Sequence, residues 1–479
     1  MEKIMKKTMK KVGWCTLSSA LLLGGCAVGP DYVRPDISMP AGWGERADTS
    51  LTDLSQWWTL FGDPTLERLV ERALQANHDL RIARARVKEA RALVGVAKGA
   101  LLPDLDASGS YRRFRTSENV PSITGPGRVR NIYSSDLDSA WEIDLFGGRR
   151  REVESESAEH EASVELERAV RVSLLGDVGA SYVEVRGNQK LMRVFREDVD
   201  AARKTLDLVR RRREAGLAAE LDVARVETEL GTVESRVPPI EAAVWQGIHR
   251  LGVLLGQEPR ALAEEISPEG PIPVAPPEVV VGLPSELLSR RPDLRAAERR
   301  LAASTARVGV ATADLYPKFS LTAAFGLESL VVGDFSSAAS RAWTLGPFVR
   351  WPLFSGGRLR ARIRAVDARV EEALASYERA VLIALEEVED ALVAYLREWD
   401  RHKSLEGAVA EGRRAVEFAS NLYENGLVNL LDVLDARRTL YEAEAELARS
   451  DTAVSLNLVF LYKALGGGWR PDGHLHSTP

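Results

Sequence analysis

Apolar residues recur at helical spacing along one long stretch in the second half of the chain. They lie on average about 3.6 residues apart, which is the period of a straight α-helix. The positions are Ile363, Val366, Val370, Leu374, Tyr377, Val381, Leu385, Val388, Leu392, Tyr395 and Trp399. The pattern predicts one long helix over 357–425, and a similar stretch predicts another over 148–215. Each helix would be roughly 100 Å long, whereas globular helices average about 11–12 residues. Two such rods predict a tube or stalk, and packing inside one globular bundle is the alternative.

Four shorter windows alternate apolar or small residues with polar ones, which is typical of β-strands with two unlike faces. They are 104–114, 131–146, 318–328 and 341–354. In the second window, one face carries Tyr133, Leu137, Trp141 and Ile143, and the other carries Asp136, Asp138, Glu142 and Asp144. A soluble β-sandwich alternates in the same way. The windows are rich in aromatic residues, however, and are long enough for the roughly 9–11 tilted residues of a transmembrane strand. An outer-membrane sheet is therefore favoured.

Four strands cannot close a barrel, because about eight is the minimum. An open sheet in lipid would leave unpaired backbone groups at its edges, each costing several kcal/mol. Other copies of the chain must therefore complete the barrel. Two copies would give an interior filled by side chains, whereas three copies would leave a lumen. The predicted fold is a homotrimer with a 12-stranded transmembrane β-barrel, four strands per chain, and an all-α tunnel of long helices.

The sequence also contains an internal tandem duplication, because short motifs recur in the same order at offsets of about 210 residues. The pairs include Asp79-Leu80-Arg81 with Asp293-Leu294-Arg295, Val94-Gly95-Val96-Ala97 with Val308-Gly309-Val310-Ala311, Leu221-Asp222-Val223 with Leu431-Asp432-Val433, and Leu255-Gly256 with Leu465-Gly466. The first copy is expected over 65–258 and the second over 284–468, with a C-terminal tail over 469–479. The proline-rich connector over 259–283 is expected to be an extended link without helix or central strand.

The N-terminus has the pattern of an export signal. Lysines, a short apolar run and small residues fill 1–25 and end before Cys26. Leu23-Gly24-Gly25-Cys26 resembles a bacterial lipobox, in which the cysteine thiol is lipidated and the chain is cut before it. An ordinary signal peptide with an incidental cysteine is the alternative. Ala27 follows where an Asp would indicate the inner membrane, so a lipidated segment over 26–64 at the outer membrane of a Gram-negative bacterium is expected.

Composition narrows the function further. With 45% hydrophobic and 28% charged residues the chain can bury a large core, and a net charge of −6 argues against nucleic-acid binding. Its two cysteines, Cys15 and Cys26, exclude a disulfide framework and a cysteine zinc site. The histidines are scattered, and the chain has neither a nucleophile elbow nor a Walker loop. Catalytic residues, a metal site and any cofactor other than the lipid on Cys26 are therefore not expected.

Three further motifs occur in order along the mature chain. They are Cys26-Ala27-Val28-Gly29-Pro30-Asp31-Tyr32-Val33-Arg34-Pro35, Trp57-Trp58-Thr59-Leu60-Phe61-Gly62-Asp63-Pro64, and Leu283-Pro284-Ser285-Glu286-Leu287-Leu288 with Arg290-Arg291-Pro292-Asp293-Leu294-Arg295. These motifs resemble the outer membrane factor family, in particular the NodT-type lipoproteins related to TolC. The resemblance implies a homotrimeric exit duct for small molecules, with its tunnel in the periplasm. It also implies a periplasmic adaptor and an inner-membrane transporter of the resistance-nodulation-division (RND) type as partners. A type I protein-secretion channel or a non-conducting lipoprotein stalk is the alternative.

The resemblance also gives a role to the turns after the two long helices. Ala215-Gly216-Leu217 and Asn425-Gly426-Leu427 resemble the turns at the periplasmic tips of the family's tunnel, which meet the adaptor. Glycine can end a helix in the left-handed conformation, so a capped helical hairpin is the simpler interpretation. The family's usual valine is absent from both turns, which puts the usual adaptor preference in doubt.

Two acidic residues beside the second turn resemble the family's lumen gate. Asp432 and Asp435 have the i, i+3 spacing that puts both carboxylates on one helix face. In a trimer they would form two rings that attract cations, and a solvated helix face is the alternative. Asp222 and Tyr423 stand where some members latch neighbouring helices, with Val428 where a basic residue can assist.

Overall fold

The computed structural model describes residues 27–45, 53–119, 127–273 and 281–470. The chain forms two compact units, each assembled from three stretches of sequence. Unit 1 comprises Met1–Asp36, Arg86–Ser163 and Ala297–Tyr377, and unit 2 comprises Ile37–Ala85, Val164–Ala296 and Glu378–Pro479. Each unit therefore contains parts of both sequence copies. The export signal and Cys26 lie outside the described residues.

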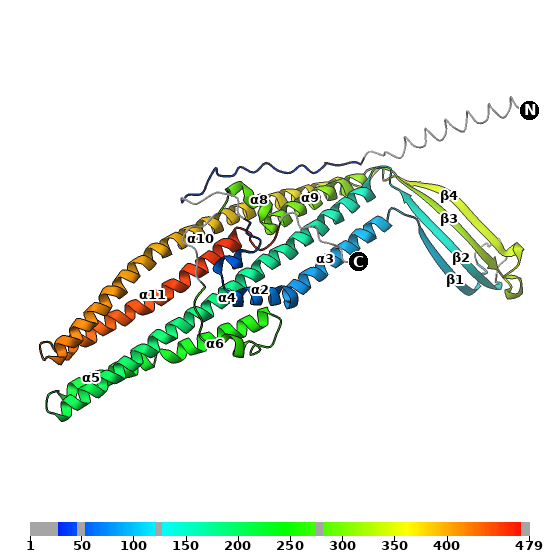
Figure 1. The fold of residues 1–479 in the computed structure, drawn as a ribbon. Coiled ribbons are helices and arrows are strands. Elements are labelled where there is room, and N and C mark those ends of the chain that lie inside the picture. Colours follow the sequence, from blue (N-terminus) through cyan, green and yellow to red (C-terminus); the bar gives the residue numbers. More distant parts are fainter. Residues whose placement is uncertain (1–26, 46–52, 120–126, 274–280, 471–479) are drawn as a thin grey trace, which may run out of the picture. The chain divides into compact units, whose positions relative to one another are not determined.

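Unit 1 contains one antiparallel sheet of four strands in the order β1-β2-β3-β4 (Figure 1). The strands are β1 (Asp104–Arg115), β2 (Val129–Ile143), β3 (Lys318–Ser329) and β4 (Arg341–Arg350). The prediction of four strands per chain, two from each sequence copy, is confirmed. Among the described strands, β1 and β4 lie at the edges and each pairs with one neighbour.

Most strand bounds lie within two residues of the expected ones, but β2 and β4 end three and four residues earlier than expected. β2 ends at Ile143, so Asp144 does not belong to the polar face of the strand. Its carboxylate instead accepts hydrogen bonds from the Arg149 and Arg150 N–H groups, at 3.2 and 2.9 Å, and caps the following helix. β4 ends at Arg350, short of residue 354, because Pro352 has no N–H to donate to a strand ladder.

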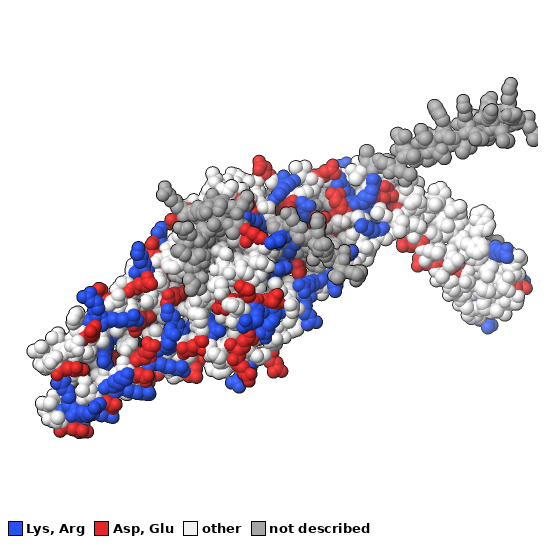
Figure 2. Space-filling view, viewed as in Figure 1, with Lys and Arg blue, Asp and Glu red and all other residues white. Residues whose placement is uncertain are grey.

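Large apolar side chains are exposed on this sheet. Leu137 of β2 pairs with Phe325 of β3, which pairs with Trp343 of β4, so the three share one face. All three are exposed, Trp343 by 75%. The visible surface of the strands in Figure 2 is mostly uncharged. A contiguous apolar face of this kind is unusual on a protein in water and typical of a strand in contact with lipid.

The two longest elements are α4 (Gly148–Glu214) and α10 (Arg358–Glu424), of 67 residues each. At about 1.5 Å per residue each helix is about 100 Å long, which is the length expected from the sequence. α3 (His78–Gly99) precedes β1, and α9 (Pro292–Ala313) precedes β3, so both copies follow the order helix, strand, strand, long helix.

Among the described residues, none of the helices combines the length and the apolar character needed to cross a membrane.

The two copies differ after their long helices. The first copy continues with α5 (Glu220–Glu234) and α6 (Val237–Leu254), whereas the second has the single helix α11 (Leu430–Ala464). The break in the first copy coincides with Pro238 and Pro239. Prolines fit the first turn of a helix, where the N–H groups have no intrahelical partner, but they interrupt a helix that continues through them.

The connector between the copies is not wholly extended. A short helix, α7 (Ala263–Ile266), forms within it, so the expectation of no helix over 259–283 is wrong. These four residues include no proline, which leaves their N–H groups free to bond. The remaining short elements are α8 (Leu287–Arg290) and the 3₁₀ helices η2 (Pro284–Glu286), η3 (Val332–Asp334) and η4 (Ala338–Ser340).

An aromatic cluster holds the N-terminal part of unit 2 in place. The 3₁₀ helix η1 (Trp57–Phe61) buries Trp57 to 1% exposure. The Trp57 ring contacts those of Trp58, Phe61 and Tyr462 of α11, at centroid distances of 6.0, 6.1 and 5.7 Å. α2 (Pro64–Ala76) follows and is capped by the Asp63 carboxylate.

Candidate functional site

The long helices end within unit 2 in two glycine turns of the same geometry, here named the tip turns (residues 215–218 and 425–428). Gly216 has a φ of +73° and Gly426 a φ of +72°, in the left-handed region that favours glycine. The N–H groups of Leu217 and Leu427 donate to carbonyls in the last helical turns, at 2.8 and 2.9 Å. This Schellman arrangement satisfies carbonyls that a helix end leaves free. It also leaves both leucines more than 70% exposed, at 72% and 71%.

Asp432 and Asp435 lie in the first turns of α11, and both are exposed. The Asp432 carboxylate accepts a hydrogen bond from the Asn429 N–H at 3.1 Å, and the Asn429 side chain accepts one from the Asp432 N–H at 3.2 Å. This reciprocal pair is a capping box. Both acids line a surface cavity of about 680 Å³, together with Leu221 of α5. Asp432 therefore caps its helix and also contributes to the cavity.

Arg438 belongs to this cavity and was missed by the sequence reasoning. Its guanidinium pairs with Asp435 at 2.6 Å, and both side chains are mostly exposed. The available signal was the i, i+3 spacing of opposite charges on one helix. Because both side chains are more than half exposed, water screens this pair and it contributes little to stability.

The polar groups of Asp222 and Tyr423 contact other residues within the chain. The Asp222 carboxylate accepts a hydrogen bond from the Ala219 N–H at 3.2 Å and lies 3.7 Å from Arg225. Tyr423 contacts Arg212 of α4 instead: the guanidinium carbon lies 4.4 Å from the ring centroid, and Nη1 donates to the Tyr423 carbonyl at 3.2 Å. This contact joins the ends of the two long helices within one chain. No sequence signal pointed to it, because the two residues are 211 positions apart.

A buried carboxylate also lies on α4, before the helix reaches the tip turn. Asp198 is 7% exposed. Burial, and then repulsion by Glu229, raises its pKa to about 6 against the attraction of Arg236 and Arg437. The folded chain therefore disfavours the ionised form of this side chain.

We expect Asp198→Asn to raise the free energy of unfolding by about 2 kcal/mol at pH 7.5, where the wild-type carboxylate is ionised. Between about pH 4 and 6 the native state binds more protons at this site than the unfolded state, so this contribution falls as the pH rises. The gain should therefore vanish near pH 4. Unfolding in detergent at both pH values measures it, with the exposed Asp200→Asn as the control. Equal stability of Asp198→Asn and wild type at pH 7.5 would contradict the expectation.

In unit 1, the residues that follow Cys26 are held against the helices. Arg151 of α4 is 4% exposed and pairs with Asp31 at 2.6 Å. Gly29 has a φ of +91° and approaches Gly309 so closely that a Cβ at position 29 would lie 2.4 Å from the Gly309 Cα. These contacts fix the chain just after the expected lipidation site.

The described histidines, His78, His160, His249 and His402, lie on four different helices. In the part of the chain that the structure describes, no group of three or more His, Cys, Asp or Glu side chains is arranged to hold a metal ion.

Comparisons with known proteins agree with this architecture. The chain matches the family described as "Outer membrane efflux protein" over residues 69–257 and 283–467. Nodulation protein T of Rhizobium leguminosarum bv. trifolii is 31% identical over 465 residues, which cover 97% of this chain and 99% of that protein. The pyoverdine export outer membrane protein OpmQ of Pseudomonas aeruginosa is 35% identical over 485 residues, covering 95% and 97%. The solved structure of the outer-membrane channel OprN has a TM-score of 0.87 at 38% identity and covers 93% of this chain and 100% of that one. The chain thus belongs to the outer membrane efflux protein family.

Proposed function

We propose that three copies of this chain form a lipid-anchored exit duct in the outer membrane for small molecules. The duct receives its cargo from a periplasmic adaptor and an RND-type inner-membrane transporter. The observation that carries the proposal is the sheet of unit 1, which combines an exposed apolar face with two edge strands that each pair on one side.

The edges favour assembly with other copies. β1 and β4 each present a row of unpaired backbone groups among the described strands, and in lipid each such group costs several kcal/mol. Pairing β1 of one chain with β4 of the next would satisfy both rows. Three chains would supply about twelve strands, enough for a barrel with an open interior.

The relatives support the cargo class and the partners. Similar proteins are named as the outer membrane proteins of a solvent efflux pump and of pyoverdine export, and both names denote export of small molecules. The exposed Leu217 and Leu427 of the tip turns are the positions proposed to meet the adaptor.

The proposed lumen gate, formed by Asp432 and Asp435, is tested by removing the two carboxylate charges. We expect Asp432→Asn with Asp435→Asn to lower the cation-over-anion permeability ratio by about twofold to fivefold, because two rings of carboxylates would no longer attract cations. Reversal potentials in planar bilayers under a KCl gradient measure the ratio. Glu264→Gln on α7 removes an exposed carboxylate elsewhere and should leave the ratio unchanged. An unchanged ratio in the double variant would exclude these residues from the conducting path.

The conduit itself is tested by photo-crosslinking in living cells. A photoreactive residue at Leu427 or Leu217 should capture a periplasmic adaptor, and the identity of its pump would separate small-molecule export from protein secretion. The same residue at Val253, which is exposed on α6, is the matched control and should not capture it. Capture of peptidoglycan-bound proteins alone at the tip positions would favour a non-conducting stalk.

A further inference from the structure

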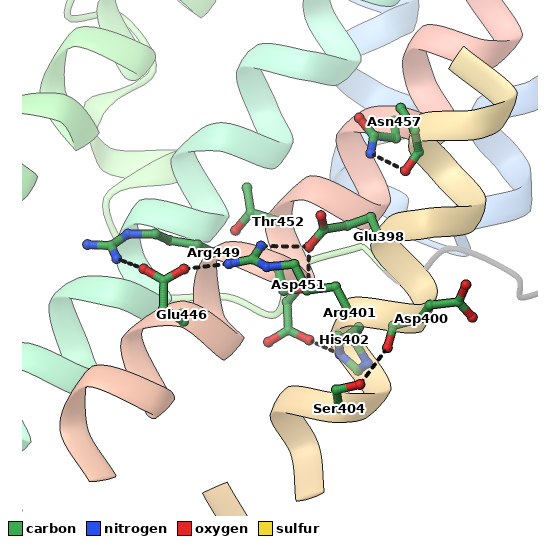
Figure 3. A network of polar contacts seen from close by, with 12 residues as sticks. Glu398, Asp400, Arg401, His402, Ser404, Glu446, Arg449, Asp451, Thr452 and Asn457 are labelled. Carbon is green, nitrogen blue, oxygen red and sulfur yellow. Dashed lines mark hydrogen bonds and ion pairs between the residues drawn. The ribbon is translucent and has the colours of Figure 1, made fainter. Parts of the chain in front are cut away.

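A histidine lies where three helices of unit 2 meet. The His402 side chain on α10 is 13% exposed, and its Nε2 lies 2.8 Å from Oδ1 of Asp451 on α11 (Figure 3). Asp451 also pairs with Lys190 of α4. All three residues line a cavity of about 570 Å³. The imidazole therefore takes part in the linkage of α10 to α11 and, through Asp451, to α4.

The contact with Asp451 fixes the neutral form of the ring. A carboxylate only accepts hydrogen bonds, so Nε2 carries the proton and donates it to Asp451. Nδ1 is then a bare acceptor, buried and without a hydrogen-bond partner among the described residues. Oε2 of Glu406, which is also an acceptor, lies 3.8 Å from it. In the neutral state, two acceptors therefore face each other.

Charged side chains from three helices surround the ring. Glu406 faces it from α10, Asp451 from α11 and Lys190 from α4, so with a neutral ring these three carry one excess negative charge. Arg193 of α4 and Glu269 of the connector line the same cavity with opposite charges. Protonation of His402 would cancel the excess and turn Nδ1 into a donor toward Glu406.

A neighbouring network of arginine and glutamate ion pairs does not depend on the protonation of a histidine. Arg401 of α10 pairs with Glu398 at 2.9 Å and also with Glu446 of α11, which pairs with Arg449 (Figure 3). None of these four side chains is a histidine, the residue that ordinarily changes its charge between about pH 5 and 8. The arginine network therefore gives α10 and α11 a permanent contact beside the titratable one.

We propose that His402 holds α11 against α10 more strongly at acidic pH, through its contact with Asp451. This contact is here named the clasp. In its protonated form His402 donates a charge-assisted hydrogen bond to Asp451 of α11 and also faces Glu406 on its own helix. In its neutral form only the weaker neutral hydrogen bond to Asp451 joins the two helices. Beyond His402, both helices of this hairpin continue to the second tip turn and to Asp432 and Asp435. Acidification would therefore stiffen the hairpin that carries these acids. The inference concerns the helices alone and does not depend on the proposed export function.

Amide hydrogen exchange of the full-length protein in detergent tests the clasp. All variants carry Asp198→Asn, so that this second titrating group does not contribute. After correction for the intrinsic effect of pH, peptides covering 396–406 and 446–455 should exchange about threefold more slowly at pH 5.5 than at pH 7.5. His402→Gln should abolish this difference, and Glu406→Gln, which leaves the Asp451 contact in place, should reduce it. His78→Gln removes an exposed histidine on α3 and should retain the full difference.

The outcomes distinguish a pH-dependent interhelical contact of His402 from a role of this side chain in packing alone. A pH difference that persists in His402→Gln, or no difference in the parent protein, would overturn the proposal. If His402→Gln does not fold, Asp451→Asn decides: a pH difference that persists without the interhelical carboxylate would contradict the clasp, and its loss would support it.

Discussion

Replacing Trp57 by alanine is expected to lower the free energy of unfolding by about 3–5 kcal/mol, the usual range for deleting a buried large aromatic side chain. The indole is 1% exposed and contacts the rings of Trp58, Phe61 and Tyr462. Its removal would leave a cavity between η1 and α11 that the surrounding helices cannot close. Thermal or denaturant unfolding in detergent, followed by far-UV circular dichroism, measures the loss.

Trp57→Phe is the graded control for this prediction. It keeps an aromatic ring in the cluster and removes an indole N–H that has no hydrogen-bond partner among the described residues. The loss should therefore be well below that of alanine, about 1–2 kcal/mol. Equal losses for the two variants would show that the ring contacts do not determine the stability of this region.

Replacing Arg291 by methionine is expected to lower the free energy of unfolding by about 2–3 kcal/mol, because it removes the charge-assisted hydrogen bonds of a buried guanidinium to two half-exposed carboxylates. The Arg291 side chain is 10% exposed and binds Asp293 through two nitrogens, at 2.7 and 3.0 Å. It also pairs with Glu387 of α10 and donates to the Ala464 carbonyl at 3.0 Å. One guanidinium thus connects the start of α9, the middle of α10 and the end of α11.

Lysine at position 291 tests whether charge alone is sufficient. Lysine keeps the positive charge but cannot reproduce the planar, two-nitrogen contact with Asp293. We expect Arg291→Lys to recover about half of the stability lost in Arg291→Met. Unfolding midpoints of the two variants and of wild type give the comparison, and full recovery by lysine would exclude a geometric role for the guanidinium.

The regular elements of this chain could be predicted because their signals are local and repeated. The apolar period and the flanking glycines gave helix ends within a residue or two of Gly148, Glu214 and Glu424. The alternation of polar and apolar residues located four strands. The helix α7 could not be predicted from the average composition of the connector, because its prolines lie outside Ala263–Ile266.

The contacts of the candidate site were likewise predictable only where both partners lie close together in the sequence. The pairing of Asp435 with Arg438 follows from spacing on one helix and was open to prediction. The contact of Arg212 with Tyr423 depends on two helix ends meeting in space, and no local pattern encodes it. For the same reason, the carboxylate of Asp198 looks ordinary in the sequence, whereas burial by neighbouring helices raises its pKa to about 6.

The pairing of β2 with β3 has a consequence for biogenesis. Ile143 pairs with Phe319 and Tyr133 with Ser329, so the β1–β2 hairpin is exported roughly 180 residues before its partner strand, with one edge of β2 open to any other strand. A periplasmic chaperone that shields this edge would protect the chain during the interval. Two molecules exported side by side without it could exchange hairpins, since β3–β4 of either chain offers the same edge. Slow translocation of the second half should therefore favour domain-swapped aggregates over correctly paired sheets.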